Sequence, residues 1–248
     1  MASVAQIWRH PIKSHGAERL DETVLRAGQT VPGDRRWAVA HTAANAKDGA
    51  WSPCVNFSRG AKAPGLMAMR CRYDDHSGQV YLSHPGLGDI SLDPDTEGDA
   101  LIAWAGGLIP DGRAQSARVV RAGSAGMTDS DWPSVSLLNL ASLRALGQRL
   151  GQTLDPRRFR GNIWLDGLAP WEEFDWIGRS VTIGDATLTV RERITRCRAT
   201  MANPETGRID ADTLSALAEG WGHRDFGVYA TVDTGGRVAE GALVRALP

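Results

Sequence analysis

The chain has 248 residues, of which 42% are hydrophobic and 23% charged, and its formal net charge is −1. This composition is that of a globular protein of one or two domains, and it excludes overall disorder and argues against a general binder of nucleic acid or anionic membrane. No run approaches the ~18 apolar residues of a membrane span and the first residues carry no secretory signal, so we expect a soluble, cytoplasmic protein that contacts neither membrane nor nucleic acid.

The first half of the chain is predicted to form short strands separated by turns rich in Gly, Pro, Asn and Asp. Residues 41–65 predict a long irregular loop, of a kind that is uncommon unless it is functional or mobile. Residues 66–73 and 79–83 predict a hairpin, and residues 99–104 a short helix. The remaining strands are expected at residues 4–8, 23–25, 36–40 and 90–92.

The second half combines strands with two helices. Residues 141–150 carry Leu143, Leu146 and Leu150 at helical spacing, and Gly151 follows as a C-terminal cap. A second helix is expected at residues 210–219, with Asp210 as its N-cap. The last strands, residues 226–232 and 237–244, predict a final hairpin. Further strands are expected at residues 118–121, 135–138, 162–166, 180–183 and 187–191.

This order of elements is mainly β or α+β, with a few short helices. Because strands and helices do not alternate, a barrel or a mixed α+β fold is favoured over a parallel βαβ fold. Residues Pro110, Asp111 and Gly112 mark the expected boundary between two domains, residues 1–112 and residues 113–248.

Cys197 lies in the densest candidate segment of the chain, between Arg196 and Arg198, with Thr195 and Thr200 nearby. Positive neighbours favour a thiolate, which ligates a soft metal or attacks an electrophile. The alternative is a small filler residue whose neighbouring arginines point to water. The three cysteines are too few and too widely spaced for a zinc site or a disulfide framework.

Three further segments are candidates for anion binding or for turns. Residues 157–162 contain three arginines and an asparagine, which suit an oxyanion or phosphate, although a solvated charge run is the alternative. Residues 10–16 end a strand at a proline and place Lys13 and Ser14 where a ligand could bind. Residues 33–39 predict a turn with an Asp34–Arg35 ion pair and a core Trp37. The common phosphate-loop, dinucleotide, nucleophile-elbow and HExxH motifs are missing from the sequence.

The order of these segments along the chain resembles that of a known protein family. PIKS at residues 11–14 is followed by GDRRW at 33–37, RFRGNIWLDG at 158–167, TRC at 195–197 and NPETG at 203–207. This set resembles the MOSC family, the molybdenum-cofactor-sulfurase C-terminal-like domains, with the N-terminal β-barrel domain that accompanies them. The resemblance extends from Val4 to Leu247. It implies a MOSC-type β-barrel over residues 113–248, preceded by the β-barrel-like domain over residues 1–112.

The resemblance implies a role for individual residues. Cys197 is expected to ligate molybdenum and to be the catalytic residue. Five residues are expected to bind the molybdenum cofactor: Lys13, Arg160, Asn162, Thr195 and Arg196. Relatives also carry a TxR motif at the cofactor, and the nearest counterpart here is Ser58-Arg59, within a segment that is longer than usual. The second side of the cofactor site is therefore left open by the sequence.

The resemblance is to family members that reduce amidoximes and other N-hydroxylated compounds. It implies an oxidoreductase that depends on the molybdenum cofactor and reduces the N–O bond of a small N-hydroxylated substrate; the family is also associated with pyridoxal phosphate binding. Three cysteines cannot add an iron–sulfur cluster, so electrons are expected from a separate ferredoxin, flavodoxin or cytochrome. The alternatives are a carrier of the cofactor or of sulfur, as a Cys197 persulfide, and a scaffold that acts through interactions.

Overall fold

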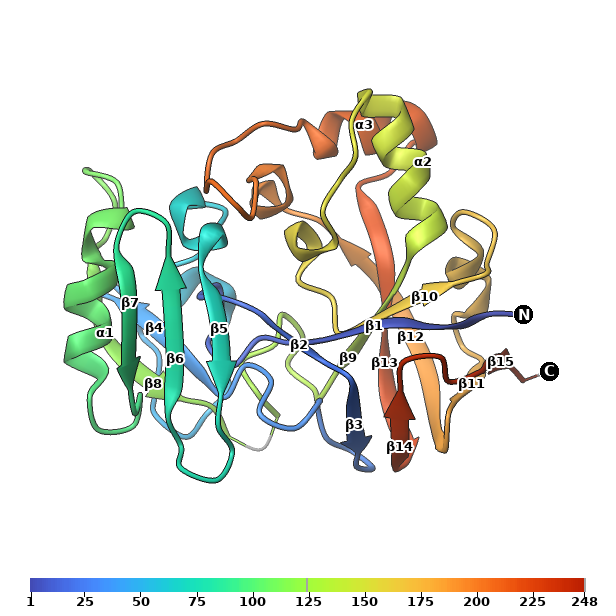
Figure 1. Cartoon of the computed structure of the whole chain (residues 1–248), viewed down its shortest axis with the longest axis horizontal. Helices are drawn as coiled ribbons and strands as arrows, with labels where there is room; N and C mark the ends of the chain where they lie inside the picture. The colour runs from blue at the N-terminus through green and yellow to red at the C-terminus, as the bar shows by residue number, and fades with distance from the viewer. Residues whose placement is uncertain (124, 248) are drawn as a thin grey trace.

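The computed structural model describes residues 1–123 and 125–247, and strands dominate it (Figure 1). The main sheet has eight strands in the order β15-β11-β12-β13-β9-β10-β1-β2 and curls into a half-barrel around an apolar core. Its neighbouring strands are antiparallel, except for the parallel pair β9 and β10. The strands are β1 (Ser3–Arg9), β2 (Glu18–Leu20), β9 (Val135–Asn139), β10 (Ile163–Asp166), β11 (Ser180–Ile183), β12 (Ala186–Thr195), β13 (Asp225–Thr234) and β15 (Val244–Ala246).

The first strands of the chain pair with strands from its second half. In β1, Ile7 lies opposite Ile163 of β10, and both side chains are fully buried in the core of the half-barrel. Next along the chain, β3 (Glu22–Leu25) forms a two-stranded sheet with β14 (Gly236–Ala239). The predicted division at residue 112 stays a prediction, and the observed pairing attaches the N-terminal strands to the larger sheet.

A second group of strands packs beside the half-barrel (Figure 1). The strands β4 (Trp37–His41) and β8 (Ser116–Arg121) form one antiparallel pair, and β5 (Arg70–Tyr73), β6 (Val80–His84) and β7 (Gly88–Leu92) form a meander. The helix α1 (Gly98–Ala105) covers them, and Leu101 joins their apolar core. The predicted hairpin is confirmed as β5 and β6, but it begins at Arg70, because Pro64–Ala68 forms a 3-10 turn instead of strand.

Two helices cover one end of the half-barrel. The helix α2 (Leu140–Leu150) is confirmed, with Asn139 capping its start and Gly151 in the left-handed conformation at its end. The helix α3 (Thr213–Trp221) begins three residues later than predicted. The predicted cap is wrong, because Asp212 accepts the cap hydrogen bond from Ser215 N, whereas Asp210 forms an ion pair with Arg158.

The predicted final hairpin is also wrong in its pairing. Both edges of β13 are occupied, one by β12 and the other by β9, so β14 pairs with β3. The long segment between β4 and β5 is irregular, as predicted. It contains only the 3-10 turns η1 (Cys54–Asn56) and η2 (Pro64–Ala68). The other 3-10 turns are η3 (Gly106–Leu108), η4 (Pro156–Phe159), η5 (Glu172–Trp176) and η6 (Arg198–Met201).

Within residues 1–123 and 125–247, the helices are all too short or too polar to cross a bilayer.

A buried carboxyl group supports the start of α2. Glu173 is fully buried in η5 and accepts hydrogen bonds from Asn139 Nδ2, at 2.9 Å, and from Ser142 Oγ, at 3.2 Å. Asn139 also caps α2, so Glu173 holds the cap in place. Burial raises the pKa of Glu173 to about 7, which outweighs the opposing effect of these hydrogen bonds. The carboxyl group is therefore protonated in the folded protein over a pH range in which it is ionised when unfolded.

We expect Glu173→Gln to make stability less dependent on pH. The folded pKa lies above the unfolded value, so the contribution of Glu173 is present below pH 4.5 and is lost as pH rises through about 7. The introduced amide mimics the protonated carboxyl group, so the variant should be more stable than the parent at pH 8, by on the order of 1–3 kcal/mol. Urea unfolding at pH 5 and pH 8 measures this difference. An advantage that is equal at both pH values would contradict it.

Candidate functional site

A cavity of about 270 Å³ lies where the loops of both halves of the chain meet the end of β12. Cys197 lines it, and so do six cationic side chains: Lys13, Arg35, Arg59, Arg158, Arg160 and Arg196. Asp129 is the acidic residue among those that line it. The cavity therefore carries an excess of positive charge and one exposed thiol, and we call it the main pocket.

The fold explains why Cys197 is accessible. It follows β12 directly and precedes η6, and its side chain is exposed. The hydroxyl of Thr195 donates to Asp225 Oδ1 at 2.6 Å and so ties the end of β12 to β13. Arg196 turns inward instead of pointing to water, because its Nε donates to Phe226 O and its Nη1 to Phe159 O, both at 2.8 Å. Of the two arginines beside Cys197, only Arg198 is exposed.

Backbone strain is concentrated at the main pocket. Three of the four non-glycine residues with positive φ in the described chain line it: Ser14 at 64°, Arg35 at 49° and Arg160 at 47°. Such conformations cost free energy and persist where the surrounding structure fixes them, and they cluster at functional sites. Here Arg35 Nη2 donates to Arg160 O at 2.8 Å, which links two of the strained residues directly.

Asp34 is the buried carboxylate behind the main pocket. It forms an ion pair with Arg35, and it accepts a hydrogen bond from His10 N at 2.7 Å. Burial acts to raise its pKa, but Arg35 and the hydrogen bonds from His10 outweigh burial and hold the pKa well below the ordinary value. Burial and the nearby charge of Arg160 lower the pKa of His10 to about 3, so His10 is neutral at pH 7. The predicted Asp34–Arg35 ion pair is therefore present.

Arg160 and Arg196 are bound by carbonyl oxygens. Arg160 donates to Gly16 O at 2.8 Å and to Ile12 O at 3.3 Å. Over residues 1–123 and 125–247, neither guanidinium forms an ion pair. Burial lowers the pKa of Arg160 to about 9 and that of Arg196 to about 10, and both remain charged at pH 7. The two guanidiniums of the main pocket can therefore bind an anionic ligand, because no carboxylate of the described chain pairs with them.

Gly16 allows this arrangement. It has φ of +81°, and a Cβ placed on it would lie 2.6 Å from Cβ of Cys71. The loop of residues 10–16 can therefore pass close to β5, which brings Gly16 O to the guanidinium of Arg160.

Lys13 is at the main pocket, but its ammonium is already engaged. It donates to Met127 O at 2.8 Å, to Thr128 O at 3.3 Å and to Asp129 Oδ1 at 2.6 Å. These contacts hold the segment that carries Asp129. In this arrangement Lys13 is a positioning residue. A bound anion would have to displace one of these acceptors to accept a hydrogen bond from the ammonium of Lys13.

Two predicted residues lie behind the main pocket. Asn162 is 2% exposed and is bonded to Ser136 and to Trp8 O, so it ties β10 to β9 and β1. Ser58 is buried and its hydroxyl lies 2.8 Å from that of Ser116. Of the Ser58-Arg59 pair, only Arg59 lines the main pocket, where its Nη1 donates to Cys54 Sγ at 2.9 Å.

The structure adds pocket residues that the sequence did not single out: Cys54, Asp129, Ser136, Arg158 and Tyr229. Burial raises the pKa of Tyr229 to about 12, with a contribution from Asp129, so its phenol keeps its proton at pH 7. Arg158 begins the resembling segment of residues 158–167, which was the available signal for it, whereas Tyr229 lies in β13, outside all of these segments. Cys54 and Asp129 gave none, because loops that are distant in sequence bring them to the pocket.

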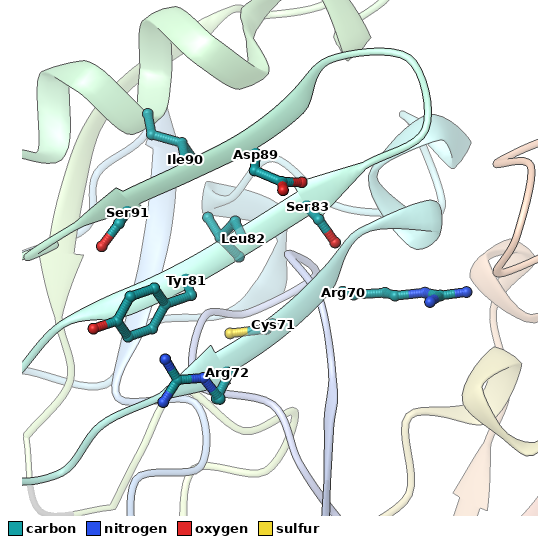
Figure 2. A pocket seen from close by; sticks show the side chains of 9 residues that line it. All are labelled: Arg70, Cys71, Arg72, Tyr81, Leu82, Ser83, Asp89, Ile90 and Ser91. Atoms are coloured by element: carbon teal, nitrogen blue, oxygen red, sulfur yellow. The ribbon is translucent and has the colours of Figure 1, made fainter.

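A wider hollow, of about 410 Å³, lies on the outer face of the β5–β7 meander (Figure 2). Arg72 stacks over the ring of Tyr81 there, 3.9 Å from its centroid. Cys71 is buried beneath, and burial raises the pKa of its thiol, which agrees with a packing role. No residue expected at a site lies in this hollow, as far as the described chain extends, so we assign function to the main pocket.

No cluster of three or more His, Cys, Asp or Glu side chains that suits a metal ion occurs in the described parts of the chain. Two thiols line the main pocket, those of Cys197 and Cys54, and that of Cys197 is the exposed one. A group that brings its own metal ligands and a phosphate fits these residues. The cationic side chains can bind the phosphate, and a thiolate can ligate a soft metal.

Comparison with known proteins gives two family matches. The model of the MOSC domain matches residues 128–245, and that of the MOSC N-terminal beta barrel domain matches residues 1–103. The chain is 34% identical over 108 residues to a molybdenum cofactor sulfurase of Anopheles gambiae, which is 39% of the chain and 14% of that protein. Over 96 residues it is 36% identical to the corresponding protein of Drosophila grimshawi, 38% of the chain and 12% of the relative. The match thus spans about an eighth of the length of these relatives.

Several solved structures resemble the chain, and two of them illustrate the likeness. YuaD of Bacillus subtilis has a TM-score of 0.47 and 12% identity, and the match covers 99% of this chain and 96% of that one. YiiM of Geobacillus stearothermophilus has a TM-score of 0.37 and 19% identity, over 46% of this chain and 54% of that one.

We expect Asp34→Ala to destabilise the protein strongly. The change leaves the largely buried Arg35 without its counter-charge and leaves His10 N without an acceptor, and breaking a buried ion pair costs about 3–5 kcal/mol. Asp34→Asn, which keeps an acceptor for His10 N, should lose less. Urea denaturation at pH 7 measures both variants, and a loss below about 1 kcal/mol for the alanine variant would show that Asp34 does not balance this charge.

Proposed function

The chain belongs to the MOSC family, and we propose that it is a molybdenum-cofactor-dependent oxidoreductase that reduces the N–O bond of small N-hydroxylated compounds. The observation that carries the proposal is the main pocket itself. It combines an exposed thiol at Cys197 with two inward-facing guanidiniums, Arg160 and Arg196, that have no carboxylate partner within the described residues.

Each pocket residue has a role in this proposal. The thiolate of Cys197 would be the protein ligand of molybdenum. Arg160 and Arg196 would bind the phosphate of the cofactor, because their guanidiniums can each donate further hydrogen bonds. Arg35 and Asp34 position Arg160 through its carbonyl oxygen. When it is bound, the cofactor supplies the two-electron chemistry that no side chain provides.

The reaction needs protons as well as electrons. An N-hydroxylated amine takes up two electrons and two protons; its N–O bond breaks, an N–H bond forms, and water leaves. Tyr229 keeps its phenolic proton at neutral pH, so its Oη can donate a hydrogen bond to the departing oxygen. The electrons would come from a separate ferredoxin, flavodoxin or cytochrome.

A carrier of sulfur is the second candidate. Cys197 is exposed, and Cys54 is a second thiol at the same pocket, with Arg59 donating to its sulfur. The outer sulfur of a Cys197 persulfide could be held beside these cations and transferred to an acceptor thiolate, which breaks the S–S bond, releases the Cys197 thiolate and needs no electron donor. The relatives are named molybdenum cofactor sulfurases, and the matched part is about an eighth of their length. Turnover of benzamidoxime with an artificial reductant separates the two candidates, since only the enzyme should reduce it.

We expect Cys197→Ala to lose molybdenum and to keep pterin. The variant removes the proposed metal ligand but leaves the cations that would bind the cofactor phosphate. Elemental analysis and fluorescent pterin oxidation products, measured on protein from a cofactor-competent host, test this. Cys54→Ala is the matched control and should keep its molybdenum. Full molybdenum and full benzamidoxime reduction in the Cys197 variant would contradict the assignment.

We expect Arg160→Ala to weaken cofactor binding by about 1.5–3 kcal/mol, the scale of a charge-assisted hydrogen bond. Pterin retained after dialysis measures this loss. Arg144→Ala is the control, because Arg144 is an exposed arginine paired with Asp166 outside the pocket. A folded Arg160 variant, by circular dichroism, that retains as much pterin as the control would show that Arg160 does not bind the cofactor.

A further inference from the structure

A second, smaller cavity shares a wall with the main pocket. It has a volume of about 170 Å³ and lies between the end of β4, the irregular segment after it and the turn after α1. Arg59 lines both cavities. We call this cavity the basic pocket, and its other polar lining residues are His41, Lys62 and Arg113.

The basic pocket is positively charged. Its lining contains Arg59, Lys62 and Arg113 and no acidic residue among those the structure describes. None of these three cations forms an ion pair with another described residue of the chain. Local backbone geometry brings two of them together: Lys62 N and Ala63 N both donate to Arg59 O at 2.9 Å, so one tight turn presents Arg59 and Lys62 at the same opening.

The floor of the basic pocket is apolar. Phe57, Ala63 and Ile109 are 2%, 2% and 8% exposed. His41 adds a polar group to the lining: its Nε2 lies 2.7 Å from Val55 O, and its buried Nδ1 has no hydrogen-bond partner among the described residues. An apolar floor below a few convergent polar groups is the usual make-up of a small-molecule site, and it favours a ligand with an apolar body over a bare inorganic ion.

Arg59 connects this second site to the first. Its Nη1 donates to Cys54 Sγ, which lines the main pocket, while its side chain also forms part of the basic pocket. A molecule with its acid group at Lys62 and Arg113 would therefore extend past Arg59 toward the pocket that carries Cys197. The small volume suits one acid group and the few atoms next to it.

We infer that the basic pocket binds the carboxylate or phosphate group of a small organic anion, and that this anion is the substrate. The inference rests on the proposed function and names its substrate class: N-hydroxylated compounds that carry an acid group. Lys62 and Arg113 bind the acid group, Phe57 and Ile109 contact the adjoining carbon atoms, and Arg59 marks the passage to the main pocket.

The first part of the experiment is binding without turnover. The full chain is titrated calorimetrically with benzoate, phenyl phosphate and the neutral analogue benzamide. We expect both anions to bind at least about tenfold more tightly than benzamide, and to lose about tenfold in affinity in Lys62→Ala/Arg113→Ala. The control is Lys47→Ala/Arg179→Ala, two exposed cations without an ion pair within the described residues, which should change nothing. Equal binding of benzamide, or anion binding that the pocket variant does not weaken, would overturn the inference.

The second part uses the loaded protein. Benzamidoxime and its 4-carboxy derivative are compared by kcat/KM, and we expect about a tenfold preference for the acid that disappears in the pocket variant. No preference in the parent, with both compounds reduced, would overturn the substrate class and leave the proposed function standing. Anion binding without reduction of either compound would overturn the substrate assignment together with the proposed function. Loss of pterin in the pocket variant would also overturn it, because the basic pocket would then hold the cofactor's own phosphate.

Discussion

The site depends on buried guanidinium groups that donate hydrogen bonds to main-chain carbonyl oxygens instead of pairing with carboxylates of the described chain. Arg160 and Arg196 are bound by main-chain acceptors from three separate segments, and one fully buried carboxylate, Asp34, lies behind the main pocket. Taking an unpaired charge out of water is costly, and a carbonyl dipole offsets only part of that cost. The fold tolerates this because so many other groups, including the His10–Asp34–Arg35 network, fix the positions of the guanidiniums before any ligand binds.

The topology makes this convergence possible. Since β1 pairs with β10, the loop after β1 and the turn before β10 lie side by side, and Ile12 and Gly16 can accept from Arg160. Since β12 pairs with β13, Arg196 reaches Phe226 O in the neighbouring strand. The first ladder thus brings together residues 144 to 148 apart in sequence, and the second brings together residues 30 apart. A one-residue slip in either ladder would turn the strand side chains to the opposite face of the sheet and displace the adjoining segments that carry the arginines.

The sequence predicts the strand-rich fold and the family, and it identifies residues near the site better than their roles. Cys197, Arg160 and Arg196 line the main pocket because the motif that carries each one ends or begins a strand there. Asn162 belongs to the same motif as Arg160, but it lies just before β10, and its hydrogen bonds to Ser136 and to Trp8 O hold it behind the pocket. Ser58 is likewise turned toward Ser116. Cys54 and Asp129 could not be found from sequence, because tertiary packing of irregular segments brings them to the pocket.

The irregular segment after β4 explains why the two cavities adjoin. A regular strand would place alternate side chains on opposite faces, and Arg59 and Lys62, three residues apart, would then point away from each other. The tight turn from Arg59 to Ala63 instead puts both cations at one opening, and Phe57 is anchored below them in the core shared by β4 and β8. The irregular backbone from Arg59 to Ala63 is thus what allows Arg59 to line both cavities beside Lys62. The segment around Ser58-Arg59, which fits the family pattern least well, therefore lies at the basic pocket, where the proposed substrates would be distinguished.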